Sequence, residues 1–247
     1  MHQKIGLKLT LDYSYNFSTP KRSKKRIKFI IIHYTGMRKE SAAISRLKDP
    51  KSKVSSHYYI KKNGSVLNLV PDLYEAWHAG KSNWKNFRFL NKDSIGIEIT
   101  NPGHEYGYKN FSSKQILSLK KLLKYLMKKY KIGIESILGH SDISPDRKKD
   151  PGEKFPWQKL AQSRLARWHK LDLKKIKRFR NNNLSSKNEE KIFMKNLNKI
   201  GYLKITENDL KKKQFIIKAF QRRYRQELIS GKIDKECFLI SKNLINS

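Results

Sequence analysis

The spacing of apolar residues along the chain predicts short strands that end in polar side chains. The run Ile-Lys-Phe-Ile-Ile-Ile-His-Tyr-Thr at residues 27–35 is rich in β-branched residues and ends near His33, as expected of a buried strand with a polar residue at its tip. The pair Asn63 and Gly64 separates two apolar segments and indicates a hairpin. Strands are predicted at residues 27–35, 57–60, 66–70, 94–100 and 137–140.

Apolar residues three and four positions apart predict helices between these strands. The longest helix begins near Ser112 or Ser113, either of which can cap it. Shorter helices are predicted around residues 41–47 and from Pro156, because proline is favoured at the first helical position. Strands that alternate with helices indicate an α/β or α+β domain built on one sheet. The apolar stripe of the longest helix consists of Ile116, Leu119, Leu123, Leu126 and Tyr130.

The C-terminal part of the chain has a different pattern. Residues 172–188 are rich in Lys, Arg, Asn and Ser and carry little periodic apolar signal, which is typical of a linker. Three helices are predicted after it: the first ends at Gly201, Asn208 caps the second, and the third follows Asp234. We therefore expect a large α/β domain at residues 1–171, a linker at 172–188 and a small all-α three-helix domain at 189–247.

The charge of the chain favours polyanionic partners without identifying one. Lys and Arg number 56 and Asp and Glu 21, so the formal net charge is 56 − 21 = +35. Such an excess attracts nucleic acid, acidic lipid or an acidic polymer over long range. However, the lysines are spread along the whole chain, which indicates a solvated surface. No array of interleaved aromatic and basic residues and no zinc-finger spacing supports nucleic-acid binding.

The cysteine content limits the possible disulfides and metal ligands, and the N-terminal sequence bears on the cellular compartment. Cys237 is the only cysteine, so the chain forms no intramolecular disulfide, and any metal must be held by histidines and carboxylates. Residues Met1 to Thr10 lack the apolar core of a signal peptide, and no stretch approaches the roughly 20 apolar residues of a transmembrane helix. The expected compartment stays open between the cytoplasm and the periplasm.

Three potential metal ligands stand where a catalytic metal site needs them. His33 and His140 end two predicted strands, and Asp150 follows on a loop rich in Pro and Lys. Catalytic zinc typically takes three nitrogen or oxygen ligands and leaves a fourth position to water. A sheet holds two such ligands rigidly while a loop supplies the third. Spacing alone is a weak signal, and the flanking sequence strengthens it.

The flanking motifs resemble the type 2 N-acetylmuramoyl-L-alanine amidases, the family that includes AmpD, AmiD and the animal peptidoglycan recognition proteins. They occur in the family's order over roughly residues 27–165. This resemblance implies an α/β fold with a mixed central sheet flanked by helices, and one zinc ion. The matching segments are Ile31-Ile32-His33-Tyr34-Thr35, Ser55-Ser56-His57-Tyr58, Ala76-Trp77-His78-Ala79-Gly80, Ser94-Ile95-Gly96-Ile97-Glu98, Gly139-His140-Ser141-Asp142 and Pro145-Asp146-Arg147-Lys148-Lys149-Asp150-Pro151-Gly152.

The resemblance also implies roles for individual residues. The zinc ligands would be His33, His140 and Asp150, and the catalytic residues Glu98 and Lys148. Glu98 would exchange protons with the attacking water and the departing alanine nitrogen, while Lys148 would stabilise the growing oxyanion. His57 is expected to brace the site, because a fourth protein ligand would exclude water. Predicted substrate-binding residues are His57, Tyr58, Trp77, His78, Asn101 and Arg147, whereas His2, His104 and His169 have no motif context.

The C-terminal helices resemble a three-helix peptidoglycan-binding domain. The resemblance rests on Lys199-Ile200-Gly201-Tyr202, Ala219-Phe220-Gln221 and Gly231-Lys232-Ile233-Asp234. An exposed basic face formed by Arg222, Arg223 and Arg225 is expected to meet the carboxylates of peptide stems. Enzymes of the AmiD type carry such a domain and those of the AmpD type generally lack it, so the domain arrangement favours the AmiD type.

Together these patterns predict a zinc amidase domain at residues 1–171. It would hydrolyse the amide bond between N-acetylmuramic acid, or its 1,6-anhydro form, and L-alanine in peptidoglycan and muropeptides, during cell-wall remodelling or recycling. The first alternative is a non-catalytic peptidoglycan recognition module, and the second is a nucleic-acid-binding protein. Because all three candidate ligands and Glu98 are present, the sequence favours the enzyme.

Overall fold

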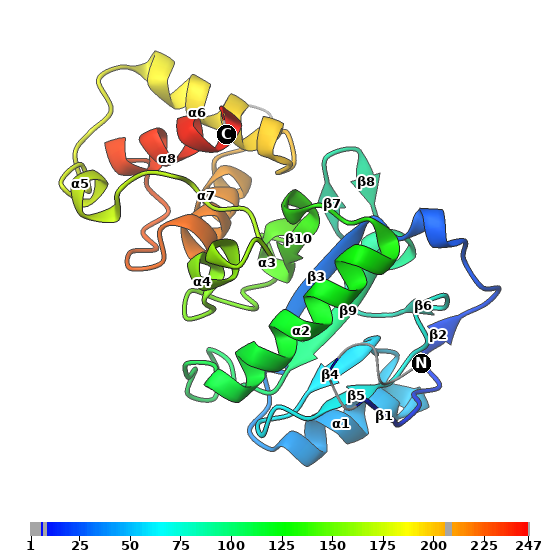
Figure 1. Cartoon of the computed structure of the whole chain (residues 1–247). Coiled ribbons are helices and arrows are strands. Elements are labelled where there is room, and N and C mark those ends of the chain that lie inside the picture. Colours follow the sequence, from blue (N-terminus) through cyan, green and yellow to red (C-terminus); the bar gives the residue numbers. More distant parts are fainter. Residues whose placement is uncertain (1–5, 7–8, 206–208, 247) are drawn as a thin grey trace.

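A six-stranded mixed sheet forms the centre of the molecule, with strand order β1-β5-β4-β9-β3-β10 (Figure 1). The computed structural model describes residue 6 and residues 9–205 and 209–246. Only β4 and β5 pair antiparallel, which confirms the predicted hairpin, and the other neighbours run parallel. The strands are β1 (Leu9–Leu11), β3 (Phe29–Tyr34), β4 (Tyr58–Ile60), β5 (Val66–Asn68), β9 (Ser94–Ile99) and β10 (Ile137–Gly139).

Helices and two small ribbons surround this sheet. The predicted α/β class is confirmed, with helices on both faces. The ribbons pair β2 (Phe17–Ser18) with β6 (Glu75–Ala76), and β7 (Asn83–Trp84) with β8 (Phe87–Arg88). The helices are α1 (Glu40–Lys48), α2 (Ser113–Tyr130), α3 (His140–Ile143), α4 (Trp157–Gln162), α5 (Leu173–Lys177), α6 (Lys187–Ile200), α7 (Leu210–Tyr224) and α8 (Lys235–Ile245).

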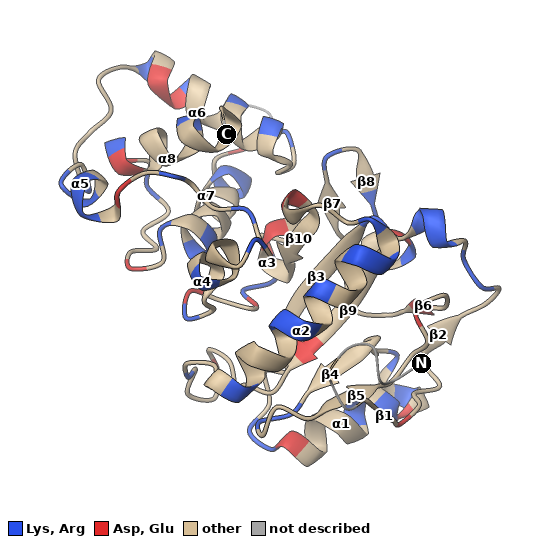
Figure 2. Cartoon of the chain, in the orientation of Figure 1, with Lys and Arg blue, Asp and Glu red and all other residues tan. Residues whose placement is uncertain are grey.

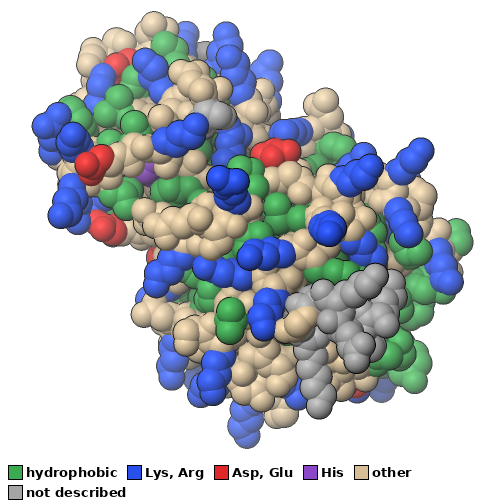
Figure 3. Space-filling model, in the orientation of Figure 1, with side chains coloured by type: hydrophobic (Ala, Val, Ile, Leu, Met, Phe, Trp, Pro, Cys, Tyr) green, Lys and Arg blue, Asp and Glu red, His purple; other side chains and the backbone are tan. Residues whose placement is uncertain are grey.

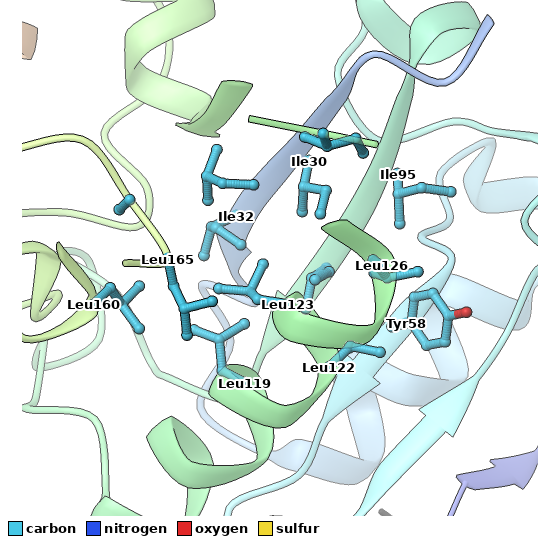
Figure 4. Close-up of a cluster of buried hydrophobic side chains, with 14 of the residues drawn as sticks. Ile30, Ile32, Tyr58, Ile95, Leu119, Leu122, Leu123, Leu126, Leu160 and Leu165 are labelled. Carbon is cyan, nitrogen blue, oxygen red and sulfur yellow. The ribbon is translucent and has the colours of Figure 1, made fainter. Parts of the chain in front are cut away.

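Side-chain alternation along β3 divides the molecule into two cores. Ile30 and Ile32 point to one face and pack against α2, as Figure 4 shows. Phe29 and Ile31 point to the opposite face and pack against the C-terminal helices. Because side chains alternate along a strand, His33 lies on the same face as Phe29 and Ile31. The first face of β3 thus contributes Ile30 and Ile32 to the apolar core, and the second face ends at His33.

Helix α2 begins where the sequence predicts and buries the predicted stripe. The Ser112 hydroxyl accepts a hydrogen bond from the Gln115 backbone N–H, and the Gln115 side chain accepts one from the Ser112 N–H. This capping box satisfies two N–H groups that a helix start leaves without partners. Along the inner face Leu119, Leu122, Leu123, Leu126 and Tyr130 are buried, and Ile116 is half-buried.

Positive charge covers the molecule without gathering at one place. Figure 2 shows Lys and Arg on nearly every element, including the outer face of α2. The face in Figure 3 likewise carries separate basic side chains with apolar atoms between them. This distribution agrees with a solvated surface and with the absence of a nucleic-acid signature in the sequence. Among the described residues, no helix has both the length and the apolar character needed to cross a membrane.

The C-terminal helices share a core with the sheet. All three predicted helices are present as α6, α7 and α8, and α6 is followed by Gly201 as expected. They pack on the face of β3 and β10 that α2 does not cover. The segment predicted as a linker contains α5, whose Ile176 is buried in this shared core.

Some sequence-based expectations fall on residues that the structure does not describe. Asn208, the predicted cap of the second C-terminal helix, and His2 lie outside the described residues. Most of the segment Met1 to Thr10 also lies outside them. In the described part, Asp209 caps α7 by accepting a hydrogen bond from the Lys212 N–H.

The core beneath α2 should dominate the stability of the sheet. Leu123→Ala is expected to lower the free energy of unfolding by about 3 kcal/mol, because the site loses apolar burial and gains a cavity. Leu117→Ala is the matched control, since Leu117 lies on the same helix and is 57% exposed. Urea unfolding measures both, and similar losses in the two variants would contradict the proposed core.

Candidate metal centre

Three side chains from three segments converge at the end of the sheet. His33 ends β3, His140 begins α3 directly after β10, and Asp150 lies on the following loop. The Nδ1 atoms of the two histidines are 2.9 Å apart, and Asp150 Oδ2 lies 3.0 Å from that of His33 and 3.1 Å from that of His140. All three side chains are buried. The structure thus brings together the three ligands that the sequence predicts.

Parallel pairing and one loop contact explain why these residues meet. Strands β3 and β10 are neighbours with Gly139 opposite Ile32, so their carboxyl ends lie at the same edge of the sheet. The Ser141 N–H donates to the Asp150 carbonyl at 2.8 Å and folds the loop back onto α3. The loop is also held near α3 by the Lys148 N–H, which donates to the Ser144 carbonyl at 3.0 Å.

A chain of hydrogen bonds sets the tautomer of His33. The Ser94 hydroxyl donates to the Leu90 carbonyl, so its oxygen accepts from His78 Nε2–H at 3.3 Å. His78 Nδ1 then accepts from His33 Nε2–H at 3.1 Å. In the neutral ring, His33 Nδ1 is therefore left with a lone pair that points into the cluster.

A different partner, the Ala79 carbonyl, sets the tautomer of His140. Its Nε2 lies 3.2 Å from the Ala79 carbonyl, which can only accept, so Nε2 carries the proton and Nδ1 presents a lone pair. Two imidazole lone pairs and a carboxylate oxygen therefore face one another at about hydrogen-bond distance with no proton assigned between them. Such an arrangement is repulsive unless a cation lies among the three atoms. The donor set fits a divalent metal ion.

Gly96 makes room for the His78 ring. A Cβ atom at position 96 would lie 2.4 Å from the His78 ring, a distance that real atoms do not tolerate. Behind this ring, His57 Nδ1 accepts from the Gly96 N–H at 3.0 Å, and its Nε2 lies 3.0 Å from the Tyr74 carbonyl. The glycine in the predicted strand 94–100 is thus required by close packing of an imidazole on the backbone.

Burial controls the charge of the cluster. It lowers the pKa of His33 to about 4, and His140 acts in the same direction. It also lowers the pKa of His78, with His33 as the next cause. At neutral pH, His33 and His78 are therefore neutral.

Glu98 lies beside the cluster on the neighbouring strand. It is the register partner of His33 in the parallel β3–β9 pair and faces the same cavity. Its Oε2 atom is buried and has no hydrogen-bond partner among the described residues. Burial raises the pKa of Glu98 well above the usual value, the charge of Asp150 adds to this, and Lys148 opposes it. A carboxyl group with a raised pKa at a cavity wall is suited to proton transfer.

The cluster opens into a cavity of about 820 Å³. Its wall includes Lys148 and Lys149 from the loop before Asp150, and Arg38 and Arg46 from the region of α1. The cationic wall suits an anionic ligand. Further lining residues include Tyr34, Trp77, His78, Glu98, His104, Glu105, Tyr106 and Arg147.

Only some of the predicted substrate-binding residues line this cavity. Trp77, His78 and Arg147 do so. Trp77 is anchored by its indole N–H, which donates to Ser18 Oγ at 2.8 Å. Arg147 donates to the carbonyls of Ala79 and Lys81, so much of its hydrogen-bonding capacity is used within the protein.

His57, Tyr58 and Asn101 do not line the cavity, which corrects the expectation that they contact substrate. Tyr58 points to the α2 face of the sheet and donates to Asp72 Oδ1 at 2.6 Å (Figure 4). His57 is fully buried behind His78, which agrees with the bracing role. The buried Asn101 side chain donates to the Lys109 carbonyl at 2.8 Å and shapes the loop that carries His104.

A rim contact that the sequence did not reveal lies beside His33. The Tyr34 hydroxyl is 2.8 Å from His104 Nδ1, and His104 Nε2 is 3.1 Å from Glu153 Oε2. The only available signal was His104 in a loop rich in Gly, with no motif around it. These three side chains connect the end of β3 with the segment after Asp150 and fix one wall of the cavity.

The basic face expected on the C-terminal helices is mostly absent. Arg223 and Arg225 are buried rather than exposed, and each forms an ion pair inside the protein: Arg223 with Asp142 and Arg225 with Asp234. Arg222 is half-buried. The expectation of an arginine cluster open to peptide stems was therefore wrong, because buried ion pairs with Asp142 and Asp234 neutralise two of its three members.

Known proteins similar to this chain are cell-wall amidases. A family model described as N-acetylmuramoyl-L-alanine amidase matches residues 23–153. The chain is 33% identical over 233 residues to N-acetylmuramoyl-L-alanine amidase AmiD of Escherichia coli, covering 89% of this chain and 83% of the relative. It is 39% identical over 112 residues to 1,6-anhydro-N-acetylmuramyl-L-alanine amidase AmpD of Haemophilus influenzae, covering 45% of this chain and 59% of the relative.

Solved structures agree with these sequence matches. The complex of E. coli AmiD with anhydro-N-acetylmuramic acid-L-Ala-D-gamma-Glu-L-Lys has a TM-score of 0.78 and 32% identity, covering 93% of this chain and 92% of that one. AMPDH3 of Pseudomonas aeruginosa has a TM-score of 0.76 and 29% identity, covering 97% of this chain and 98% of that one. Both likenesses extend over nearly the whole chain, including the C-terminal helices.

Buried neutral histidines should make the metal-free protein acid-sensitive. Burial lowers the pKa of His57 to about 3 and that of His169 to about 4, from 6.5. Because the folded-state pKa is the lower one, the unfolded chain binds more protons below about pH 6.5. Stability is then fully present above about pH 6.5 and falls with pH toward the folded-state values, by about 1.4 kcal/mol per pH unit for each histidine. Urea unfolding of chelator-treated protein between about pH 7 and 4.5 measures this slope.

The control separates His57 from the other titrating groups. His57→Gln should reduce the slope by about one proton, whereas Leu117→Ala, on the exposed face of α2, should leave it unchanged. An unchanged slope in the His57 variant would contradict the neutral state of that ring.

Proposed function

The chain belongs to the N-acetylmuramoyl-L-alanine amidase family, and we propose that it cleaves the bond between N-acetylmuramic acid and L-alanine with one zinc ion held by His33, His140 and Asp150. It is an amidase that acts on peptidoglycan or muropeptides, the 1,6-anhydro forms included. The observation that carries the zinc proposal is the convergence of three electron-pair donors on one point beside Glu98. No corresponding observation favours a non-catalytic recognition module.

The nature of the donors supports zinc. Two imidazole nitrogens and one carboxylate oxygen form a ligand set that zinc hydrolases use, with a further position left for water. The second ring nitrogen of each histidine donates a hydrogen bond, to His78 from His33 and to Ala79 from His140, which is the usual orientation of a metal-binding histidine. His57 and His78 lie behind His33 and do not complete a fourth coordination position in the described site.

Glu98 and Lys148 supply the remaining chemistry. When bound, zinc lowers the pKa of a water molecule and polarises the amide carbonyl. Glu98, with its unpartnered oxygen at the cavity wall, accepts the proton of the attacking water and later delivers one to the alanine nitrogen. Lys148 brings a positive charge to the same cavity, where negative charge grows on the carbonyl oxygen.

The cavity suits an acidic, partly apolar substrate. The tripeptide in the E. coli AmiD complex carries carboxylates, and the wall of this cavity presents Arg38, Arg46 and Lys149. Trp77 offers an apolar surface close to the metal cluster. We place the glycan and the stem peptide along this wall, with the scissile amide between Glu98 and Lys148.

Product analysis tests the function directly. Incubation with intact sacculi and with soluble anhydro-muropeptide should release free stem peptides that begin with L-alanine, as identified by mass spectrometry. A chelator should abolish release and added zinc should restore it, because the metal is bound reversibly. Asp150→Ala should bind no zinc by elemental analysis and yield no product. Full activity in the chelated protein, or zinc-free wild type, would overturn the proposal.

Glu98 can be separated from metal binding. Glu98→Ala is expected to retain stoichiometric zinc and to lose at least about 100-fold in kcat, the magnitude typical of a lost general base. Glu135→Ala is the control, because Glu135 is exposed and does not line the cavity. Near-normal turnover by the Glu98 variant would remove this residue from the mechanism.

A further inference from the structure

A charged contact joins the C-terminal helices to the helix that starts with His140. Arg223 on α7 donates to Asp142 Oδ2 at 2.6 Å from Nη1, and to the Ile137 carbonyl at 3.0 Å from Nη2. Both charged side chains are almost fully buried. One guanidinium therefore holds both sides of the segment Ile137 to Asp142, in which His140 lies.

Asp142 is buried, and both of its carboxylate oxygens accept hydrogen bonds within the protein. Its Oδ2 also accepts from the Gly139 N–H at 2.8 Å, which closes the start of α3 at His140. Its Oδ1 accepts from the Tyr202 hydroxyl at 2.7 Å. Three donors, two of them from the C-terminal helical region, thus fix the carboxylate two residues after a predicted ligand. Rigid outer partners of this kind orient metal ligands.

The position of the Gly201–Tyr202 segment brings the Tyr202 hydroxyl to Asp142. A Cβ atom at position 201 would lie 2.3 Å from the Trp84 indole, so only glycine permits this approach. The Gly201 carbonyl also accepts from the Lys85 N–H at 2.7 Å. Both contacts fix the end of α6 on the β7–β8 ribbon, and Tyr202 is then placed to reach Asp142. The element whose sequence resembles a peptidoglycan-binding domain therefore faces inward.

We propose that Asp142 is a positioning residue for His140, and that the C-terminal helices hold it through Arg223 and Tyr202. These helices are then a structural part of the metal centre, in addition to any role in binding polymer. The inference rests on the proposed function, because it requires His140 to be a zinc ligand. Their effect on His140 is indirect, because neither Arg223 nor Tyr202 lines the cavity.

Zinc affinity of the full-length chain tests the proposal. Arg223→Met is expected to weaken zinc binding by about 10-fold or more, measured by competition with a chromophoric chelator, because a lost outer partner costs about 10–100-fold. Tyr202→Phe removes a single hydroxyl and should weaken binding several-fold even if the arginine variant fails to fold. Arg223→Lys, which keeps the charge, should recover part of the loss.

Arg225→Met is the matched control. Arg225 is as buried as Arg223 and lies on the same helical region, but its ion pair is with Asp234, within the C-terminal helices. This variant should lower the Tm of the metal-free protein by a similar amount and leave the zinc Kd within about two-fold. If Arg223→Met and Tyr202→Phe bind zinc like wild type, or if the control weakens binding equally, the positioning role is overturned while the amidase function stands. A wild-type protein that binds no zinc overturns both.

Discussion

The mutual repulsion of three electron-pair donors is the constraint on which the site depends. His33, His140 and Asp150 direct lone pairs at one another over about 3 Å, and each orientation is enforced from behind. The Leu90–Ser94–His78 chain fixes the first ring, and the Ala79 carbonyl fixes the second. A site held in this way is already organised for a cation, so little binding energy would be needed to order its three side chains.

The two faces of the sheet have different roles: one packs against the large apolar core, and the other carries residues of the candidate metal centre. The α2 face contains the large aliphatic core and the buried Tyr58–Asp72 contact. The opposite face carries His33 and Glu98 as register partners on adjacent parallel strands. Because the two faces belong to the same strands, packing beneath α2 also fixes the positions of His33 and Glu98.

Most of the fold could be predicted from the sequence because it depends on local signals: strand patterns predicted the sheet, and helical spacing predicted α2. The grouping of His33, His140 and Asp150 was predicted from strand ends and from the motifs that carry the family resemblance. The failures concern long-range partners. Arg223 resembles a surface arginine until Asp142, 81 residues earlier, is known to face it. Tyr58 follows a motif histidine, yet alternation turns it to the other face. The linker pattern at 172–188 gave no sign of Ile176 entering the core.

The contact between Gly96 and His78 has a consequence for how this sequence can drift. The imidazole occupies the volume that any side chain at position 96 would need. A chain that acquires alanine at 96 must therefore displace the ring at 78, and with it the Nδ1 acceptor that orients the His33 Nε2–H. The two positions are therefore coupled by steric exclusion, so a larger side chain at 96 changes the hydrogen bonding of the metal cluster from a distance.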